Sequence, residues 1–226
     1  YMVLDKSVTE RIPEGNVSFE ASVFPGLVAQ RQLYAYRTSH RYYSIGNLER
    51  LPITQAFLTR NPVVLLDRDG VLNEKMPRAE YVTDWSKWRW RDGSLDALKA
   101  FHEAGYSIVV ITNQPGIARG KMTGEELEQI HGNLTRDAEG AGAAIERIFH
   151  CPHGWDEGCD CRKPAPGMLF AAQKELHLDL SRTYFVGDDS RDGEAAEAAG
   201  CRFRLLGENE SLLDVAHEIA AAQGRS

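Results

Sequence analysis

The chain has 226 residues, a formal net charge of −7 and 42% hydrophobic residues, an ordinary composition for a globular protein with a buried core. The negative charge argues against a nucleic-acid partner and against binding to anionic membranes, and an anionic substrate would need a local basic cluster. No apolar stretch reaches membrane-spanning length and no secretory signal pattern is present, which predicts a cytoplasmic protein.

The first sixty residues are expected to form a region of their own. They read as strand and loop fragments rich in Tyr and Arg, starting with a strand at Met2–Leu4, and end in a helical stretch at 47–58. They lack the alternation of strand and helix that follows. We therefore predict two regions, 1–60 and 61–226.

From Pro62 onward, short apolar runs alternate with helical patterns. Strands are expected at Val63–Leu66, Ser107–Ile111, Ile145–Phe149, Thr183–Val186 and Arg202–Leu206. Helices are expected at Ser94–Ala104, 123–140, Gly167–Leu176, Glu194–Ala199 and Leu212–Ala222. Strands separated by helices of this length indicate an α/β fold with a doubly wound parallel sheet.

Polar residues follow three of these strands directly. Asp67 ends the first strand, Thr112 the second and Asp188 the fourth, and in a parallel sheet such ends lie at one edge. Asp69, two residues after Asp67, points to the same side of an extended chain. A lone Asp-Arg-Asp-Gly turn could be a solvated strand end, but three polar strand ends at one edge predict a site.

The residue types at this edge suit phosphoryl transfer. Asp67 can act as the nucleophile and form an aspartyl-phosphate, and Asp69 can act as general acid and base. Because nucleophile and phosphate are both anionic, Mg²⁺ is needed, with Asp67 and Asp188 as ligands and Asp189 or Asp192 as further candidates.

Two further residues would stabilise the transferring phosphoryl group. The ammonium group of Lys163 would neutralise its charge, and the Thr112 hydroxyl would hydrogen-bond its oxygens. Each alone is commonly a surface charge or a strand cap, so their assignment depends on the carboxylates being nearby.

A second group of residues has the spacing of a metal site. Cys151, His153, Cys159 and Cys161 form a C-x-H-x5-C-x-C array, and three thiolates with one imidazole are typical of a closed structural zinc site. Buried free thiols are the alternative. The array leads directly into Arg162 and Lys163, so zinc would position the basic pair that meets the phosphate.

Four segments, in order, resemble the haloacid dehalogenase-like (HAD) hydrolase superfamily. They are Asp67-Arg68-Asp69-Gly70, Thr112-Asn113, Lys163 and Gly187-Asp188-Asp189. The resemblance implies a Rossmann-like α/β sheet with a minimal cap and the catalytic roles already given. It further implies that the backbone carbonyl of Asp69 binds magnesium.

The zinc array followed by Arg-Lys-Pro-x-Pro-Gly-Met resembles the D-glycero-D-manno-heptose 1,7-bisphosphate phosphatases, as does the stretch Thr112–Gly120. This implies hydrolysis of the 7-phosphate in the synthesis of nucleotide-activated heptose. Arg162, Asn113, Gln114 and Tyr81 would contact the substrate. Histidinol-phosphate phosphatase shares the scaffold and a zinc loop of the same kind and is the alternative, but Pro164–Met168 favours the heptose group. The loop Glu74–Val82 is longer than in that group, which leaves the anomer preference open.

The N-terminal sixty residues resemble the carboxyl end of a sugar-phosphate nucleotidyltransferase. Val17–Glu20, Val23–Pro25 and Ser44–Leu51 carry the resemblance, but Ser44 replaces a metal-binding Asp and the glycine-rich nucleotide loop is missing. We expect no transferase activity with heptose 1-phosphate, but fusion with or docking to such a domain. A non-enzymatic zinc-dependent binding module is a third hypothesis.

Overall fold

The computed structural model describes residues 3–35, 46–58, 61–77 and 79–223. The chain falls into two compact units, Tyr1–Ser39 and His40–Ser226, so the division lies well before the boundary predicted at residue 60. Helix α2 (Leu51–Leu58), part of the helical stretch expected at 47–58, belongs to the second unit. In the described ranges, no helix is long and apolar enough to cross a lipid bilayer.

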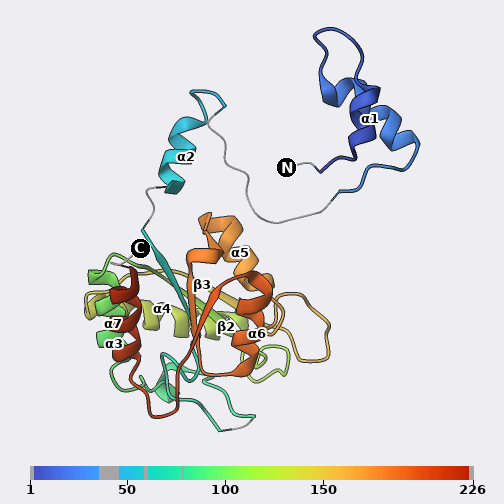
Figure 1. Ribbon diagram of the computed structural model, residues 1–226. Coiled ribbons are helices and arrows are strands. Elements are labelled where there is room, and N and C mark those ends of the chain that lie inside the picture. The colour runs from blue at the N-terminus through green and yellow to red at the C-terminus, as the bar shows by residue number, and fades with distance from the viewer. Residues whose placement is uncertain (1–2, 36–45, 59–60, 78, 224–226) are drawn as a thin grey trace. The chain divides into compact units, whose positions relative to one another are not determined.

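The first unit is helical, so the strand fragments expected there are wrong for its described residues. It contains the 3₁₀ helix η1 (Lys6–Arg11) and helix α1 (Phe19–Ala29), seen in Figure 1. The side chain of Ser18 caps α1 by accepting a hydrogen bond from the backbone N–H of Ala21. The unit has a small apolar core: Val8, Val23 and Leu27.

The second unit is built on a five-stranded parallel sheet in the order β3-β2-β1-β4-β5. The strands are β1 (Val63–Leu66), β2 (Ser107–Asn113), β3 (Ile145–Cys151), β4 (Tyr184–Gly187) and β5 (Arg202–Leu205). Leu66, at the end of β1, pairs with Val110 of β2 and Val186 of β4. This register brings the carboxyl ends of the three central strands to one edge, as predicted.

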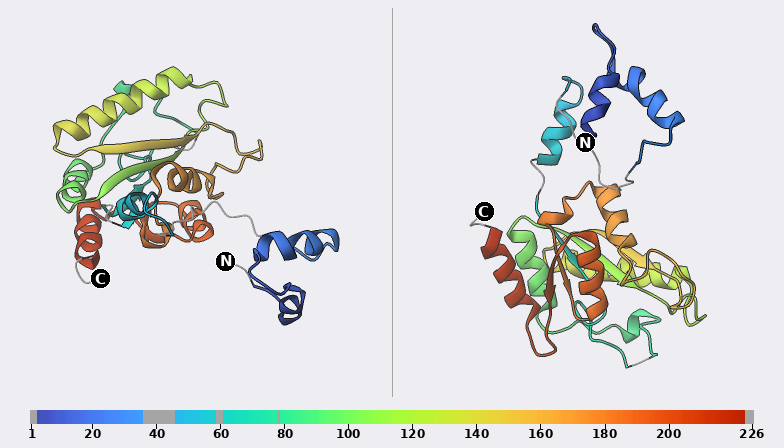
Figure 2. Two further views of the ribbon diagram at one scale, coloured as in Figure 1. Left: turned by 90° about the horizontal axis from the view of Figure 1, so that it is seen from above. Right: turned by 45° about the vertical axis from the view of Figure 1, so that its right-hand side comes forward.

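Helices cover both faces of the sheet (Figures 1 and 2). One face carries α3 (Ser94–Glu103), α4 (Gly124–Gly140) and α7 (Leu212–Gln223), and the other carries α5 (Gly167–Leu176) and α6 (Ser190–Ala199). The predicted α/β class, a doubly wound parallel sheet, is therefore confirmed.

Alternating residues of β1 supply the two cores. Val64 and Leu66 pack with α3 and α7, whereas Leu65 packs with α5 and α6, and all three are fully buried. Complete burial on both faces explains why β1 is an uninterrupted apolar run. Between β1 and α3, the described residues form one short helix, η2 (Trp85–Lys87), which agrees with a minimal cap.

Candidate active site

The polar strand ends meet in one cleft of about 580 Å³. Asp67 and Asp69 reach it from the end of β1, Thr112 from β2 and Asp188 from the end of β4. Lys163, from the loop between β3 and α5, completes the set. The fold thus brings together the five residues that sequence reasoning assigned to phosphoryl transfer.

Lys163 lies between two carboxylates at the floor of the cleft. Its Nζ is 2.8 Å from Oδ1 of Asp67 and 2.7 Å from Oδ1 of Asp192, and it donates to the Ile111 carbonyl at 3.0 Å. Burial raises the pKa of the Asp67 carboxyl to about 7, although the Lys163 ammonium opposes the shift. A divalent cation beside Asp67 would hold it ionised.

The Asp69 carboxylate is surrounded by donors. Nη2 of Arg68 donates to both of its oxygens at 3.0 and 2.9 Å, Asn73 donates to Oδ1 at 3.0 Å, and Gln114 donates to Oδ2 at 2.7 Å. Burial alone would raise the pKa of Asp69, but these donors outweigh it and hold the pKa below its usual value.

Two residues expected to contact substrate, Asn113 and Gln114, also hydrogen-bond to neighbouring protein groups. Nδ2 of Asn113 donates to the Lys163 carbonyl, and Oδ1 accepts from the Lys163 backbone N–H, both at 3.0 Å. Gln114, only 1% exposed, bridges Asp69 and the Thr112 hydroxyl. Both line the cleft, and their contacts orient Lys163, Asp69 and Thr112.

The carboxylates at the strand ends suit a cation. Oxygens of Asp67, Asp188 and Asp192 lie within 4.8 Å of one another. Lys75 places a positive charge 2.7 Å from Asp188, which shows that this group attracts a cation. Asp189, one of the two further candidates, is paired with Arg191 and caps α6, which explains why α6 begins earlier than expected.

Gly70 permits the backbone after Asp69 to lie close to the carboxylate of Asp188. Its φ is +96°, and a Cβ at this position would lie 2.2 Å from Oδ2 of Asp188. Any other residue must therefore displace the Asp188 carboxylate as well as adopt an unfavourable backbone conformation.

We expect Gly70→Ala to lower kcat by about 100-fold, because a displacement near 1 Å can cost that much. Steady-state phosphate release measures it. Gly105→Ala is the matched control, since Gly105 has φ +81° but nothing within 4 Å of the added methyl. Equal activity in the two variants would contradict the steric argument.

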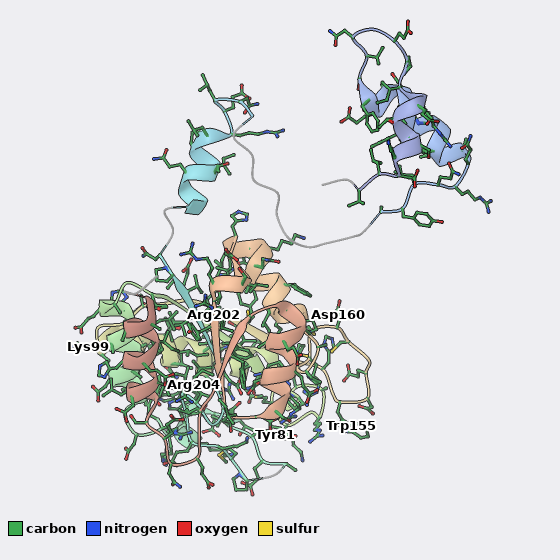
Figure 3. The ribbon with its side chains drawn as sticks, viewed as in Figure 1. Tyr81, Lys99, Trp155, Asp160, Arg202 and Arg204 are labelled. Carbon is green, nitrogen blue, oxygen red and sulfur yellow. The ribbon has the colours of Figure 1, made fainter. Side chains whose placement is uncertain are left out.

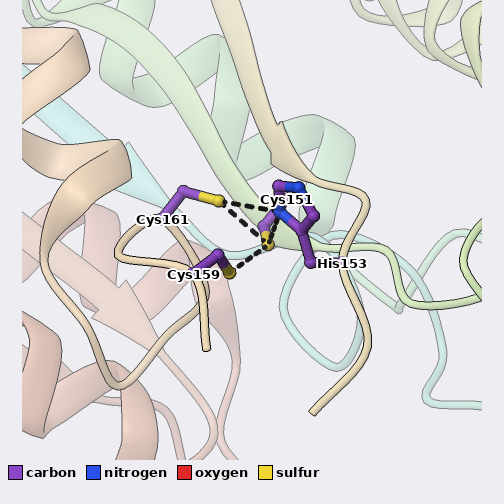
Figure 4. A group of neighbouring side chains, drawn as sticks. All are labelled: Cys151, His153, Cys159 and Cys161. Atoms are coloured by element: carbon purple, nitrogen blue, oxygen red, sulfur yellow. Dashed lines mark hydrogen bonds between the residues drawn. The ribbon is translucent and has the colours of Figure 1, made fainter. Parts of the chain in front are cut away.

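The predicted metal array is assembled at the end of β3 (Figure 4). The Sγ atoms of Cys151 and Cys161 are 3.2 Å apart, those of Cys151 and Cys159 are 3.7 Å apart, and Nδ1 of His153 is 3.2 Å from Sγ of Cys161. A tetrahedral ion with bonds near 2.3 Å needs ligands about 3.7 Å apart. The four side chains can therefore hold a metal ion.

A third cluster with metal-ligand chemistry is formed by side chains of α4 and β3. Glu128, His131 and His150 have ligand atoms within 4.8 Å of one another. However, Nη1 of Arg68 is 3.5 Å from Nε2 of His131, and its positive charge opposes a second cation there.

The cleft also contains basic residues that sequence reasoning did not assign. Arg119 donates to the hydroxyl of Tyr81, and its guanidinium lies over the Tyr81 ring at 5.8 Å. Tyr81, labelled in Figure 3, and Arg162 line the cleft as expected. Lys75 and Arg119 come from loops without a strand-end signal, so spacing could not reveal them.

Comparison with known proteins gives consistent results. The HAD-hydrolase-like family profile matches residues 160–222. The D-glycero-β-D-manno-heptose-1,7-bisphosphate 7-phosphatase of Pseudomonas putida is 41% identical over 154 residues, covering 67% of this chain and 87% of the relative. The Escherichia coli K12 protein of that name is 36% identical over 152 residues, covering 64% of this chain and 78% of the relative. The chain belongs to the HAD-like hydrolase family.

A solved relative supports the same assignment at the level of the fold. The D,D-heptose 1,7-bisphosphate phosphatase of B. bronchiseptica, crystallised with magnesium and phosphate, matches with a TM-score of 0.68 and 34% identity. The match covers 71% of this chain and 99% of that structure. This HAD-like hydrolase is accordingly a phosphoric monoester hydrolase.

Proposed function

We propose that this HAD-like hydrolase removes the 7-phosphate from D-glycero-D-manno-heptose 1,7-bisphosphate. The observation that carries the proposal is the joint placement of Asp67, Asp69, Lys163 and Asp188 in one cleft, with the Cys/His array beside it. Relatives named for this reaction, which align with about two thirds of the chain, support the choice of substrate.

The reaction would proceed in two steps. Asp69 first binds a proton; an oxygen of Asp67 then attacks phosphorus while the bond to the sugar oxygen breaks, and Asp69 passes its proton to that oxygen. Asp69 then takes a proton from water, which attacks the aspartyl-phosphate and releases phosphate and free Asp67. Lys163 and Thr112 stabilise the charge of the transferring group in both steps.

The carboxylates of Asp67 and Asp188, with the backbone carbonyl of Asp69, would hold Mg²⁺. The donor set fits, because magnesium takes hard oxygen ligands and needs only one or two carboxylates in addition to phosphate and water. When bound, the ion screens the repulsion between nucleophile and substrate phosphate.

A second phosphate on the substrate matches the charge of the cleft. Arg119 and Arg162 both line it, and within the described residues neither is paired with a carboxylate. Two unpaired guanidinium groups favour a doubly phosphorylated sugar over histidinol phosphate, which brings a cationic amine.

A substrate panel tests the assignment. Phosphate release is compared for the β and α anomers of heptose 1,7-bisphosphate and for histidinol phosphate, with Mg²⁺ present. We expect the β anomer, for which the relatives are named, to give the highest kcat/KM. Faster hydrolysis of histidinol phosphate would overturn the proposed substrate in favour of the alternative.

We further propose that the Cys/His array holds structural zinc. Cys161→Ser should remove about one equivalent of zinc and lower the Tm by roughly 10 °C, the size expected from about 3 kcal/mol in a domain of this length. Zinc analysis and calorimetry measure both quantities. Cys201→Ser is the control, because Cys201 lies outside the array. Unchanged zinc content in the Cys161 variant would contradict the assignment.

The N-terminal region is proposed to be a nucleotidyltransferase remnant that docks to such a domain. In helix α1 the exposed large apolar side chain is Val28, 60% exposed, which docking would cover. Ser44, which argues against transferase activity, lies outside the described residues. Incubation with nucleoside triphosphate and heptose 1-phosphate should release no pyrophosphate, and release would contradict this view.

A further inference from the structure

The residue between the two catalytic carboxylates is unusually buried for a charged side chain. Arg68 is 1% exposed and is among the largest fully buried side chains of the described chain. Its guanidinium lies 5.7 Å from the centre of the Trp88 ring. Its backbone N–H donates to Oδ1 of Asp67 at 2.7 Å, so it is tied to the nucleophile as well.

The guanidinium holds the carboxylate of Asp69. Both oxygens of Asp69 accept hydrogen bonds from Nη2, at 3.0 and 2.9 Å. Both residues line the cleft, but the side chain of Asp69 is 30% exposed whereas that of Arg68 is 1% exposed. The buried guanidinium of Arg68 therefore fixes the carboxylate of Asp69, whose exposed part remains accessible to substrate.

His131 of α4 lies behind the guanidinium. Nη1 of Arg68 is 3.5 Å from Nε2 of His131, which is 5% exposed. Arginine can only donate, so Nε2 must be the acceptor and the imidazole must be neutral. Burial and the Arg68 charge support this, because they lower the pKa of His131 to about 3.

Burial of Arg68 is not expected to stabilise the fold. Nε of Arg68 is buried and has no hydrogen-bond partner among the described residues. Burying a guanidinium with an unsatisfied N–H is costly, and buried ion pairs can often be replaced by apolar side chains without loss of stability. The cost is understandable if the group serves the reaction.

We propose that Arg68 and His131 are positioning residues that hold Asp69 in place for proton transfer to the leaving group. His131 orients the guanidinium, and the guanidinium orients the carboxylate. The inference rests on the proposed function, since it assigns Asp69 the role of general acid and base. Gln114 and Asn73 hold Asp69 from other directions, so removing Arg68 displaces the carboxylate without leaving it unpartnered.

Leaving-group dependence separates this role from general damage to the fold. A sugar alkoxide is strongly basic and needs protonation, whereas p-nitrophenolate is weakly basic and leaves without it. The ratio of kcat for heptose bisphosphate to kcat for p-nitrophenyl phosphate is therefore measured for each variant. An unfolded fraction lowers both rates equally and cancels in the ratio.

The variants are Arg68→Met, His131→Leu and His131→Gln, with Asp69→Asn as reference. We expect Arg68→Met to lower the ratio by about 100-fold and His131→Leu by about tenfold, within the contribution of a general acid. His131→Gln retains an oxygen that can accept from Arg68 and should restore most of the ratio. Gln129→Leu, at an exposed position of α4, is the control and should leave it unchanged.

Three other results are decisive. Equal losses on both substrates in Arg68→Met and His131→Leu would show a structural role and overturn the proposal. An unchanged ratio in Asp69→Asn would overturn it as well, because Asp69 would then not be the acid. If the wild-type protein hydrolysed neither phosphate ester, the proposed function itself would fail.

Discussion

Asp67→Asn is expected to lower kcat by more than about 10⁴-fold, the size seen when a nucleophile is removed. The amide cannot form the aspartyl-phosphate, so the first step is lost. The fold should survive, because Lys163 keeps its partner Asp192 at 2.7 Å. Substrate should still bind, since one negative charge is removed from the site.

Phosphate release and calorimetric titration with substrate measure the two properties of this variant. Asp96→Asn is the control, as Asp96 is an exposed carboxylate on α3. Turnover near the wild-type rate would rule out the covalent mechanism, whereas loss of binding would show that the carboxylate mainly organises the site.

Lys163→Met is expected to be the most destabilising single change in the cleft. It removes the cation between Asp67 and Asp192, which are 8% and 1% exposed, and leaves two buried carboxylates facing each other. Breaking a buried ion pair in this way costs about 3–5 kcal/mol. Because we also assign Lys163 to stabilising the phosphoryl group, kcat should fall by roughly 10²–10³-fold.

The stability loss in Lys163→Met should depend on pH. Burial already raises the pKa of Asp67, and removal of the cation raises it further. A carboxyl whose pKa is higher in the folded state stabilises the fold below its unfolded pKa, near 4, and loses that contribution as pH rises through the folded pKa.

Thermal unfolding in magnesium-free buffer should therefore show a larger Tm difference from wild type at pH 8 than at pH 5. Lys99→Met, on the exposed side of α3 (Figure 3), is the control and should shift the Tm little at either pH. A pH-independent difference would contradict the assigned charge arrangement.

Local pattern predicted the elements of the second unit well. The range of β1 agrees with the apolar run Val63–Leu66, and α5 agrees with Gly167–Leu176. These segments combine a strong apolar pattern with clear terminal residues. Helix α6 begins at Ser190, before the predicted start at Glu194, because the side chain of Asp189 caps it and accepts from the N–H of Arg191.

The first unit shows where local pattern is insufficient. Helix α1 has the β-branched and aromatic residues of a strand and a proline, Pro25, in its interior. Its apolar side chains are not on one face, so no helical period is visible in the sequence. The helix is stabilised by the Ser18 cap and by the packing of Val23 against Val8.

The sequence by itself determined the chemistry at the strand ends. Asp67, Thr112 and Asp188 could be assigned because a parallel sheet brings the ends of its strands to one edge whatever the details of packing. The Cys151–Cys161 array was likewise readable from local spacing, which sets ligand distances almost independently of the rest of the chain.

Only the tertiary structure decided how these groups are held. Lys163 forms an ion pair with Asp192, and its backbone N–H donates to the side chain of Asn113. Arg68 contacts both Asp69 and His131. Apart from the contact between the adjacent residues Arg68 and Asp69, each of these contacts joins residues far apart in the sequence. Such pairs depend on where a helix or loop lies against the sheet, a matter of side-chain packing that leaves no period or spacing in the sequence.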